Sequence, residues 1–413
     1  MNIGFISTRL AGTDGVSLEV AKLATVLRRM GHQIFYCAGE LDGDVPGLFA
    51  PEFHFTDPVA LSINERAFAA SGDDFQLISD IGKQAQLLKR PLRSFLSDYE
   101  IDFVIAQNVF AIPMQLPLAQ ALAEILQETG LPALAHNHDL YWERERFKTN
   151  CIGLFLDNYF PPELPRLQQA VINSAAQRML KERRDLDSIL IPNVFDFEMP
   201  PPGIDEFNAD FRQAIGLTAE DKIFLQPTRV IPRKGIELSI ELLARLDDPR
   251  ANLVITHYAG DEGFDYLHSL QRLAWESQVN LLYVADRVGD KRGDDDQGRK
   301  VYSLWDSYAH ADFVTYPSLI EGFGNALIET IYFRLPALVN RYPVYQEDIA
   351  PKGFEFVEID GAITRDAVEK VRQWLNEPSG TKKVVEHNFR LGQTFYSYKA
   401  LSDCLKAVLV PPT

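Results

Sequence analysis

Two glutamates flank a glycine-rich turn in the second half of the chain, in the sequence EGFGNALIE over residues 321–329. The turn follows a predicted strand and is expected to open a helix. Glycines at 322 and 324 let the backbone approach a ligand closely, and the first amides of a helix attract an anion. The pattern predicts a diphosphate site at the carboxyl end of a strand, where open α/β sheets bind ligands. The alternative is a glycine turn with two solvated glutamates.

Three cations lie within six residues in the sequence TRVIPRKG over residues 228–235. The segment follows a predicted strand and precedes a predicted helix. Arg229 and Lys234 stand five positions apart across a tight loop. There the arginine fork and the lysine charge can converge on one diphosphate. Arg233 can equally be an ordinary solvated charge.

A pair of histidines, His136 and His138, ends another predicted strand on the side where ligands of such sheets bind. No third metal ligand is evident, so the pattern does not favour zinc, and we predict no metal site. A buried, hydrogen-bonded structural role fits His136. His138 is the better candidate for contact with a substrate.

The stretch over residues 136–147 is rich in aromatic and charged side chains. Those that could contact a small polar ligand are Asp139, Tyr141, Trp142 and Arg144. An aromatic ring can support a sugar ring, and an arginine can bind a carboxylate. Packing between domains explains the same residues equally well.

Three further features carry less information. The loop AGTDGVS over residues 11–17 lacks the Gly-x-Gly-x-x-Gly spacing, which argues against an NAD-dependent dehydrogenase. The acidic run over residues 294–296 lies in a polar, glycine-containing setting, so we interpret it as a solvated loop. His257 and His310 are interpreted as structural histidines.

Alternating strands and helices must position these loops. In the first half we expect strands at 2–7, 34–37, 103–106, 133–136 and 188–191, with helices at 16–30 and 163–184. In the second half we expect strands at 222–226, 252–256, 281–285, 313–316 and 337–340, with helices at 235–245 and 384–409. The first strands and helix form a βαβ unit, which is typical of parallel sheets. We therefore predict an α/β protein with two doubly wound domains.

Four prolines in residues 192–202 mark the boundary between these domains. We predict an N-terminal domain over 1–195, a linker over 196–219, a C-terminal domain over 220–395, and a helix and tail over 396–413.

Composition excludes several classes of protein. The 413 residues are 46% apolar and 24% charged, as in globular proteins of about two domains. The net charge of −17 argues against nucleic acid as a partner. The three cysteines Cys37, Cys151 and Cys404 are too scattered for a disulfide framework. No leader and no membrane-spanning run is evident, so we expect a cytoplasmic protein.

At these motifs the chain resembles the retaining glycosyltransferases of the GT-B fold, in the family 4 group (glycosyltransferases group 1). The resemblance covers nearly the whole length, and the motifs follow the family's order: the N-terminal glycine loop, His138, the Arg229/Lys234 pair, and two glutamates with seven residues between them. The sequence ILIPNVFD over 189–196 also looks like the family's interdomain crossing. The resemblance implies two Rossmann-like domains facing each other across a cleft, with a C-terminal helix that returns to the N-terminal domain.

The resemblance also implies residue roles. Arg229 and Lys234 would neutralise the donor diphosphate, Glu321 would hold donor-sugar hydroxyls, and His138 would face the reacting sugar. Glu329 would hold the ribose, and Gly15 would leave room for diphosphate or acceptor. The implied catalytic residues are Arg229, Lys234, Glu321 and His138. The implied donor-binding residues are Gly15, Gly322, Phe323, Gly324, Asn325, Ala326 and Glu329. An acceptor site would then form at Asp139, Tyr141, Trp142 and Arg144, and it would suit a small glycoside resembling glucosylglycerate.

The implied reaction moves a hexose from a nucleotide sugar to a hydroxyl of a small sugar or glycoside, with retention and without metal or cofactor. UDP and GDP are the expected bases. The family's glycine before the arginine is replaced by Thr228, and residues 255–260 and 286–300 depart from its pattern, so the base stays open. The oligomeric state is also open. The alternatives are a GT-B epimerase or phosphorylase, or a sugar-nucleotide-binding protein without activity.

Overall fold

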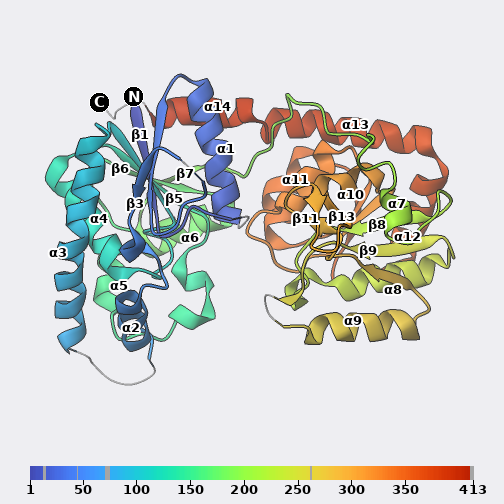
Figure 1. The fold of residues 1–413 in the computed structure, drawn as a ribbon, viewed down its shortest axis with the longest axis horizontal. Coiled ribbons are helices and arrows are strands. Elements are labelled where there is room, and N and C mark those ends of the chain that lie inside the picture. The colour runs from blue at the N-terminus through green and yellow to red at the C-terminus, as the bar shows by residue number, and fades with distance from the viewer. Residues whose placement is uncertain (13–14, 44, 70–74, 261–262, 410–413) are drawn as a thin grey trace. The chain divides into compact units, whose positions relative to one another are not determined.

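The computed structural model describes residues 1–12, 15–43, 45–69, 75–260 and 263–409. These residues form two compact α/β units (Figure 1). The first unit contains residues 1–194 together with the C-terminal segment from Tyr398, and the second contains Phe195–Ser397.

The first unit is built on a seven-stranded sheet in the order β3-β2-β1-β4-β5-β6-β7, with every pair parallel. Its strands are β1 Asn2–Ser7, β2 Gln33–Ala38, β3 Gly47–Phe49, β4 Phe103–Gln107, β5 Ala133–Asn137, β6 Leu167–Val171 and β7 Ser188–Leu190. Its helices are α1 Gly15–Arg29, α2 Pro58–Ala67, α3 Phe75–Asp98, α4 Leu116–Thr129, α5 Gly153–Tyr159, α6 Ser174–Arg184 and α14 Tyr398–Val408. Strand β4 is buried along its whole length, and its sequence FVIAQ is apolar up to Gln107. Strand β5 is equally buried, but its sequence ALAHN ends in two polar residues.

The second unit is built on a six-stranded parallel sheet in the order β10-β9-β8-β14-β15-β16. Its strands are β8 Lys222–Gln226, β9 Ala251–Ile255, β10 Asn280–Tyr283, β14 Phe313–Tyr316, β15 Ala337–Asn340 and β16 Val357–Ile359. Its helices are α7 Phe211–Ala214, α8 Ile236–Leu246, α9 Asp265–Glu276, α10 Leu304–His310, α11 Asn325–Tyr332, α12 Arg365–Asn376 and α13 Pro378–Phe395. A small sheet of β11 Val288–Gly289, β13 Lys300–Ser303 and β12 Gly293–Asp294 accompanies it.

Two predicted helices are wrong in part. The predicted helix over 163–184 contains β6, which pairs with β5 and β7, and helix α6 begins only after Asn173. The Asn173 side chain caps α6 by accepting from the Ala176 amide at 2.7 Å. The predicted helix over 384–409 is two helices, because α13 ends at Phe395 and the fully buried Tyr396 precedes α14. Pairing with neighbouring strands and burial of an aromatic ring override the local helical pattern in these two places.

The predicted return of the C-terminal helix is confirmed. Leu401, Leu405 and Val408 of α14 share a core with Val20 and Leu23 of α1. The two helices lie side by side (Figure 1). The last helix therefore completes one face of the first sheet, although it follows the whole second unit in the sequence.

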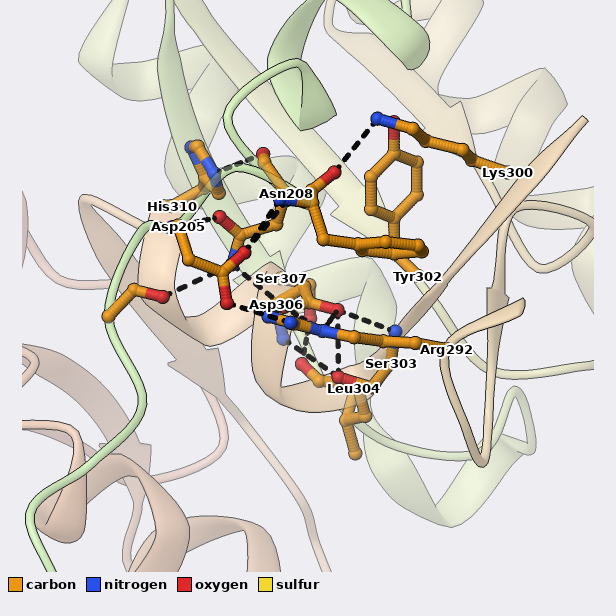
Figure 2. A network of polar contacts seen from close by, with 12 residues as sticks. Asp205, Asn208, Arg292, Lys300, Tyr302, Ser303, Leu304, Asp306, Ser307 and His310 are labelled. Atoms are coloured by element: carbon orange, nitrogen blue, oxygen red, sulfur yellow. Dashed lines mark hydrogen bonds and ion pairs between the residues drawn. The ribbon is translucent and has the colours of Figure 1, made fainter. Parts of the chain in front are cut away.

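A polar network fixes residues of the predicted linker to the second unit (Figure 2). Asn208 is fully buried, and its amide donates to Asp306 Oδ1 at 2.8 Å. Arg292, next to the short strand β12, donates to Asp306 Oδ2 at 3.0 Å and to Asp205 Oδ2 at 2.7 Å. His310 Nε2 lies 2.9 Å from the Asn208 carbonyl, in the structural role expected for it. The stretch over 286–300 and the segment around Asp205 are thus both held against α10.

Candidate functional site

The glycine-rich turn leads into α11, as the sequence predicts. Gly324 caps the helix with a φ of +122°. A Cβ at this position would lie 2.6 Å from Tyr342 Oη and 3.1 Å from Tyr316 Oη. Both the backbone conformation and the two tyrosines therefore require glycine. Asn325 and Ala326 are the first residues of α11, at the end of the helix where the helix dipole favours an anion.

The side chain of Phe323 is buried and is therefore not available to contact a ligand. It is 3% exposed, and its ring meets the Tyr396 ring edge-on at a centroid distance of 5.4 Å. Tyr342 Oη donates to the Phe323 carbonyl at 2.8 Å. Phe323 therefore anchors the turn through its ring, and Gly322 beside it is exposed.

Lys234 and Glu321 meet although 87 positions separate them in the sequence. Lys234 ends a 3₁₀ turn after β8, and its Nζ donates to Glu321 Oε1. The two side chains are only 9% and 8% exposed. Arg233 donates to the Ile320 carbonyl at 3.0 Å and lies 3.4 Å from Glu321 Oε2. The two sequence motifs therefore form one cluster at the carboxyl edge of the second sheet.

Burial and charge oppose each other in this cluster. Burial lowers the pKa of the Lys234 ammonium, and the Glu321 carboxylate offsets only part of that effect. Burial alone would raise the pKa of Glu321, but Lys234 and Arg233 bring it below its ordinary value. Glu321 is therefore held as a carboxylate that accepts hydrogen bonds.

Arg229 is exposed, and within the described ranges no hydrogen bond or ion pair engages its guanidinium. It lies close enough to Lys234 to lower the pKa of that ammonium further. The cluster therefore holds three cations against one carboxylate, in a chain whose net charge is −17. This local positive surplus is the electrostatic setting that a diphosphate requires.

Glu329 lies on α11, a little over one helical turn after the first residue of that helix, Asn325. Its Oε2 accepts a hydrogen bond from Tyr308 Oη at 2.9 Å. Three buried tyrosines that contact this site were not predicted from the sequence: Tyr308, Tyr316 and Tyr342. A tyrosine in an amphipathic helix or in a buried strand reads as ordinary core, so spacing gave no signal for Tyr308 or Tyr316.

The histidines of the first unit surround a buried glutamine. Gln107 Oε1 lies 3.1 Å from His136 Nδ1 and 3.2 Å from His138 Nε2. Burial lowers the pKa of His138 to about 4 and that of His136 well below its usual range. Both rings are therefore neutral at pH 7. His136 is 1% exposed and His138 is 7% exposed, so His138 is the more accessible of the two.

Residues of the predicted acceptor stretch differ in accessibility. Asp139 and Arg144 form an ion pair, with side chains 32% and 39% exposed. Tyr141 is half-buried. Trp142 packs with Leu180 in a core cluster and is 8% exposed. The burial of Trp142 argues against the predicted sugar platform, because its ring already has protein partners.

The N-terminal glycine loop is described only in part. Gly15 begins α1 and is exposed, with no atom within 4 Å of where a Cβ would lie. Thr13 and Asp14 lie outside the described residues.

In the described part of the chain, no group of three or more histidine, cysteine or acidic side chains is arranged to hold a metal ion. Asp295, in the acidic run, bonds to Arg299 instead. None of the helices described is both long enough and apolar enough to span a bilayer.

Comparison with known proteins identifies the family. No family model matches the chain. Mannosylglucosylglycerate synthase of Petrotoga mobilis is 32% identical over 97% of this chain and 99% of its own length. The enzyme of the same name from Thermotoga maritima is 32% identical over the full length of both chains. The chain belongs to the GT-B glycosyltransferases of the family 4 group.

Solved structures agree on the fold of this GT-B hexosyltransferase. A glycosyltransferase from Rickettsia africae superposes with a TM-score of 0.67 at 14% identity, covering 98% of this chain and 97% of the other. Sucrose-phosphate synthase from Thermosynechococcus elongatus gives 0.67 at 15% identity over 98% of each chain. Anabaena HepE in complex with UDP and glucose gives 0.66 at 16% identity over 99% of each chain. The predicted family, fold and hexosyltransferase activity are confirmed.

Proposed function

We propose that this hexosyltransferase moves a mannosyl group from a nucleotide-mannose donor to a hydroxyl of glucosylglycerate, with retention at the anomeric carbon. The observation that carries the proposal is full-length identity of 32% to two mannosylglucosylglycerate synthases. The positively charged cluster around Lys234, which suits an anionic donor, supports it.

The donor diphosphate would bind at the glycine turn before α11. We propose that Arg229 supplies the principal charge, because its guanidinium is exposed and lacks a partner among the described residues. Lys234 would add a second positive charge, and the backbone of Gly322, Gly324, Asn325 and Ala326 would supply amides. Glu321, held as a carboxylate, would accept from hydroxyls of the donor sugar. Glu329 would accept from the ribose.

Charge development explains why cations matter to this reaction. Hexosyl transfer passes through an oxocarbenium-like state while negative charge accumulates on the departing diphosphate. One hydrogen-bond donor held in place at the developing charge stabilises the transition state by about 2.7–4 kcal/mol in comparable sites. The local surplus of positive charge supports a reaction in which side chains take the place of a divalent cation. For retention we propose front-face transfer, in which the leaving phosphate accepts the acceptor proton.

The first unit would bind the acceptor. His138 is neutral, and Gly15 leaves space above the start of α1. A glycerate carboxylate would bind the open side of Arg144, which is 39% exposed beside Asp139. With Trp142 in the core, Tyr141 is the aromatic residue of this stretch that remains for contact with the sugar.

A product assay tests the proposal. GDP-mannose, UDP-mannose and UDP-glucose would each be incubated with glucosylglycerate, with and without EDTA, and the products identified by mass spectrometry and by the anomeric coupling in NMR. We expect a mannosylated product of retained configuration that forms equally well with EDTA. Donor alone should give little turnover; conversion of donor alone to an epimer would favour the epimerase.

Matched arginine variants locate the donor site. We expect Arg229→Met to lower kcat/KM by about 100-fold, as for the loss of one preorganised donor. Arg365→Met is the control, because Arg365 is exposed on α12 and pairs only with Glu369 in the contacts described. Equal activity of the two variants would contradict the donor assignment.

A further inference from the structure

We propose that Tyr308 is a positioning residue that fixes Glu329 for recognition of the donor ribose. This inference rests on the role of Glu329 in the proposed function. Tyr308 would act on the donor only through the side chain of Glu329.

The Tyr308 hydroxyl lies between α10 and α11. Oη donates to Glu329 Oε2 at 2.9 Å and lies 3.3 Å from the Ala326 carbonyl. The residue is 1% exposed, and its ring stacks on Phe333 at a centroid distance of 4.9 Å and an interplanar angle of 7°. The hydroxyl therefore cannot swing away without leaving its stacking partner. Glu329 gains a fixed orientation for the oxygen that Tyr308 holds.

The direction of this hydrogen bond does not change with pH in the working range. Burial raises the pKa of the Tyr308 phenol well above its ordinary value, and the Glu329 carboxylate raises it further. The phenol therefore stays protonated and donates. A carboxylate with one oxygen engaged in this way loses rotational freedom before the donor arrives, and preorganisation of this kind lowers the entropic cost of binding.

Helix α10 is itself anchored at its first turn (Figure 2). Ser303 and Asp306 form a reciprocal cap: the Ser303 amide donates to Asp306 Oδ2 at 2.8 Å, and the Asp306 amide donates to Ser303 Oγ at 3.3 Å. Asp306 is 1% exposed and also accepts from Arg292 and Asn208. A helix of seven residues, held at its N-terminal end by a buried carboxylate, is a rigid support for Tyr308.

The test compares Tyr308→Phe with Tyr302→Phe. Tyr302 is a second fully buried tyrosine of the same unit, and its hydroxyl donates to Asp210 Oδ1 at 2.9 Å rather than to Glu329. Calorimetry would measure Kd for UDP, GDP and their 2′-deoxyribose forms. Thermal melting would report the folding of each variant.

We expect the wild type to prefer the ribose form of the bound nucleotide by about tenfold, typical of one hydroxyl recognised by a charged group. Tyr308→Phe should reduce this preference to about twofold by weakening the ribose form, with the 2′-deoxy form unchanged. Tyr302→Phe should keep the full preference. A folded Tyr308→Phe protein with the wild-type preference would overturn the inference.

Glu329→Gln separates the proposed role of Glu329 in binding ribose from the positioning role of Tyr308. If the wild type shows no preference for ribose, or if Glu329→Gln retains it, then the proposed role of Glu329 fails and the inference fails with it. If Glu329→Gln loses the preference and Tyr308→Phe keeps it, only the positioning role of Tyr308 is wrong.

Discussion

The pH dependence of Gln107→Glu is a demanding test of the buried histidine pair. In the wild type, burial holds the pKa of His138 at about 4, so that at pH 6 about one His138 in a hundred carries a proton. The titratable group that faces His138 among its described neighbours is His136, whose pKa burial also lowers. A carboxylate at position 107 would stand about 3 Å from a nitrogen of each ring.

The size of the effect follows from Coulomb's law. At an effective dielectric constant of about 20, opposite unit charges about 4 Å apart attract by about 4 kcal/mol, which corresponds to about 3 pKa units. The pKa of His138 in the variant should therefore rise from about 4 to about 7. Because the two rings would share the added proton, the titration belongs to the pair.

The assay is kcat/KM for hexosyl transfer between pH 5 and pH 9. The wild type should show no loss from His138 down to about pH 5. The variant should lose half of its activity near pH 7 and about tenfold near pH 6, because the neutral ring is replaced by a cation. A folded variant with the wild-type profile would refute the reasoning.

Thermal stability gives a second readout with opposite signs in the two proteins. The wild-type folded pKa of His138 lies below its unfolded value of 6.5, so its contribution is present above pH 6.5 and is lost as the pH falls toward 4. In Gln107→Glu the pKa of His138 in the folded protein lies above its unfolded value. Its contribution is then present below pH 6.5 and is lost as the pH rises through 7.

Three further predictions concern the second unit. Lys234→Met should lower the free energy of unfolding by about 3 kcal/mol, because the buried Glu321 carboxylate loses its close partner and keeps only the longer contact to Arg233 at 3.4 Å. Adding Glu321→Gln should recover most of that loss in urea titrations. Gly324→Ala should cost at least about 2 kcal/mol from strain and overlap. Gly216→Ala, at a φ of +83° with open space around it, should cost about 1 kcal/mol in the same thermal scans. Burial would raise the pKa of Asp306, but the hydrogen bond from Arg292 brings it below its ordinary value. The stability that Asp306 contributes is therefore present above its ordinary pKa and is lost as the pH falls through its pKa in the folded protein. Asp306→Asn should therefore remove this acid dependence of Tm between pH 5 and pH 2, and an unchanged Tm profile would contradict the assignment.

Much of the architecture could be predicted from the sequence because buried parallel strands are recognised as short apolar runs. The predicted strand over 222–226 coincides with β8, and those over 313–316 and 337–340 coincide with β14 and β15. The strand β6 was missed because its sequence, LQQAV, contains two glutamines and lacks the apolar pattern of its neighbours. Its position between β5 and β7 determines its conformation, and no local pattern carries that information.

The candidate site could be predicted only where residue type and spacing carry the chemistry. Lys234 and Glu321 were singled out from separate glycine loops, and the structure places them in one ion pair. The spacing could not show that Lys234 pairs with Glu321, or that Arg229 is the cation of this cluster without a described partner. Gln107, Tyr308 and Tyr316 were missed because a buried polar group is recognised only by its partners. Trp142 was misinterpreted because a buried tryptophan and an exposed one are identical in sequence.

The crystal structure of the protein with bound UDP or GDP tests the central claim most directly. We predict that the diphosphate oxygens lie within hydrogen-bond distance of the Arg229 guanidinium and of the first amides of α11, with the ribose at Glu329. A nucleotide bound elsewhere in the second unit, with Arg229 still facing solvent, would contradict the account.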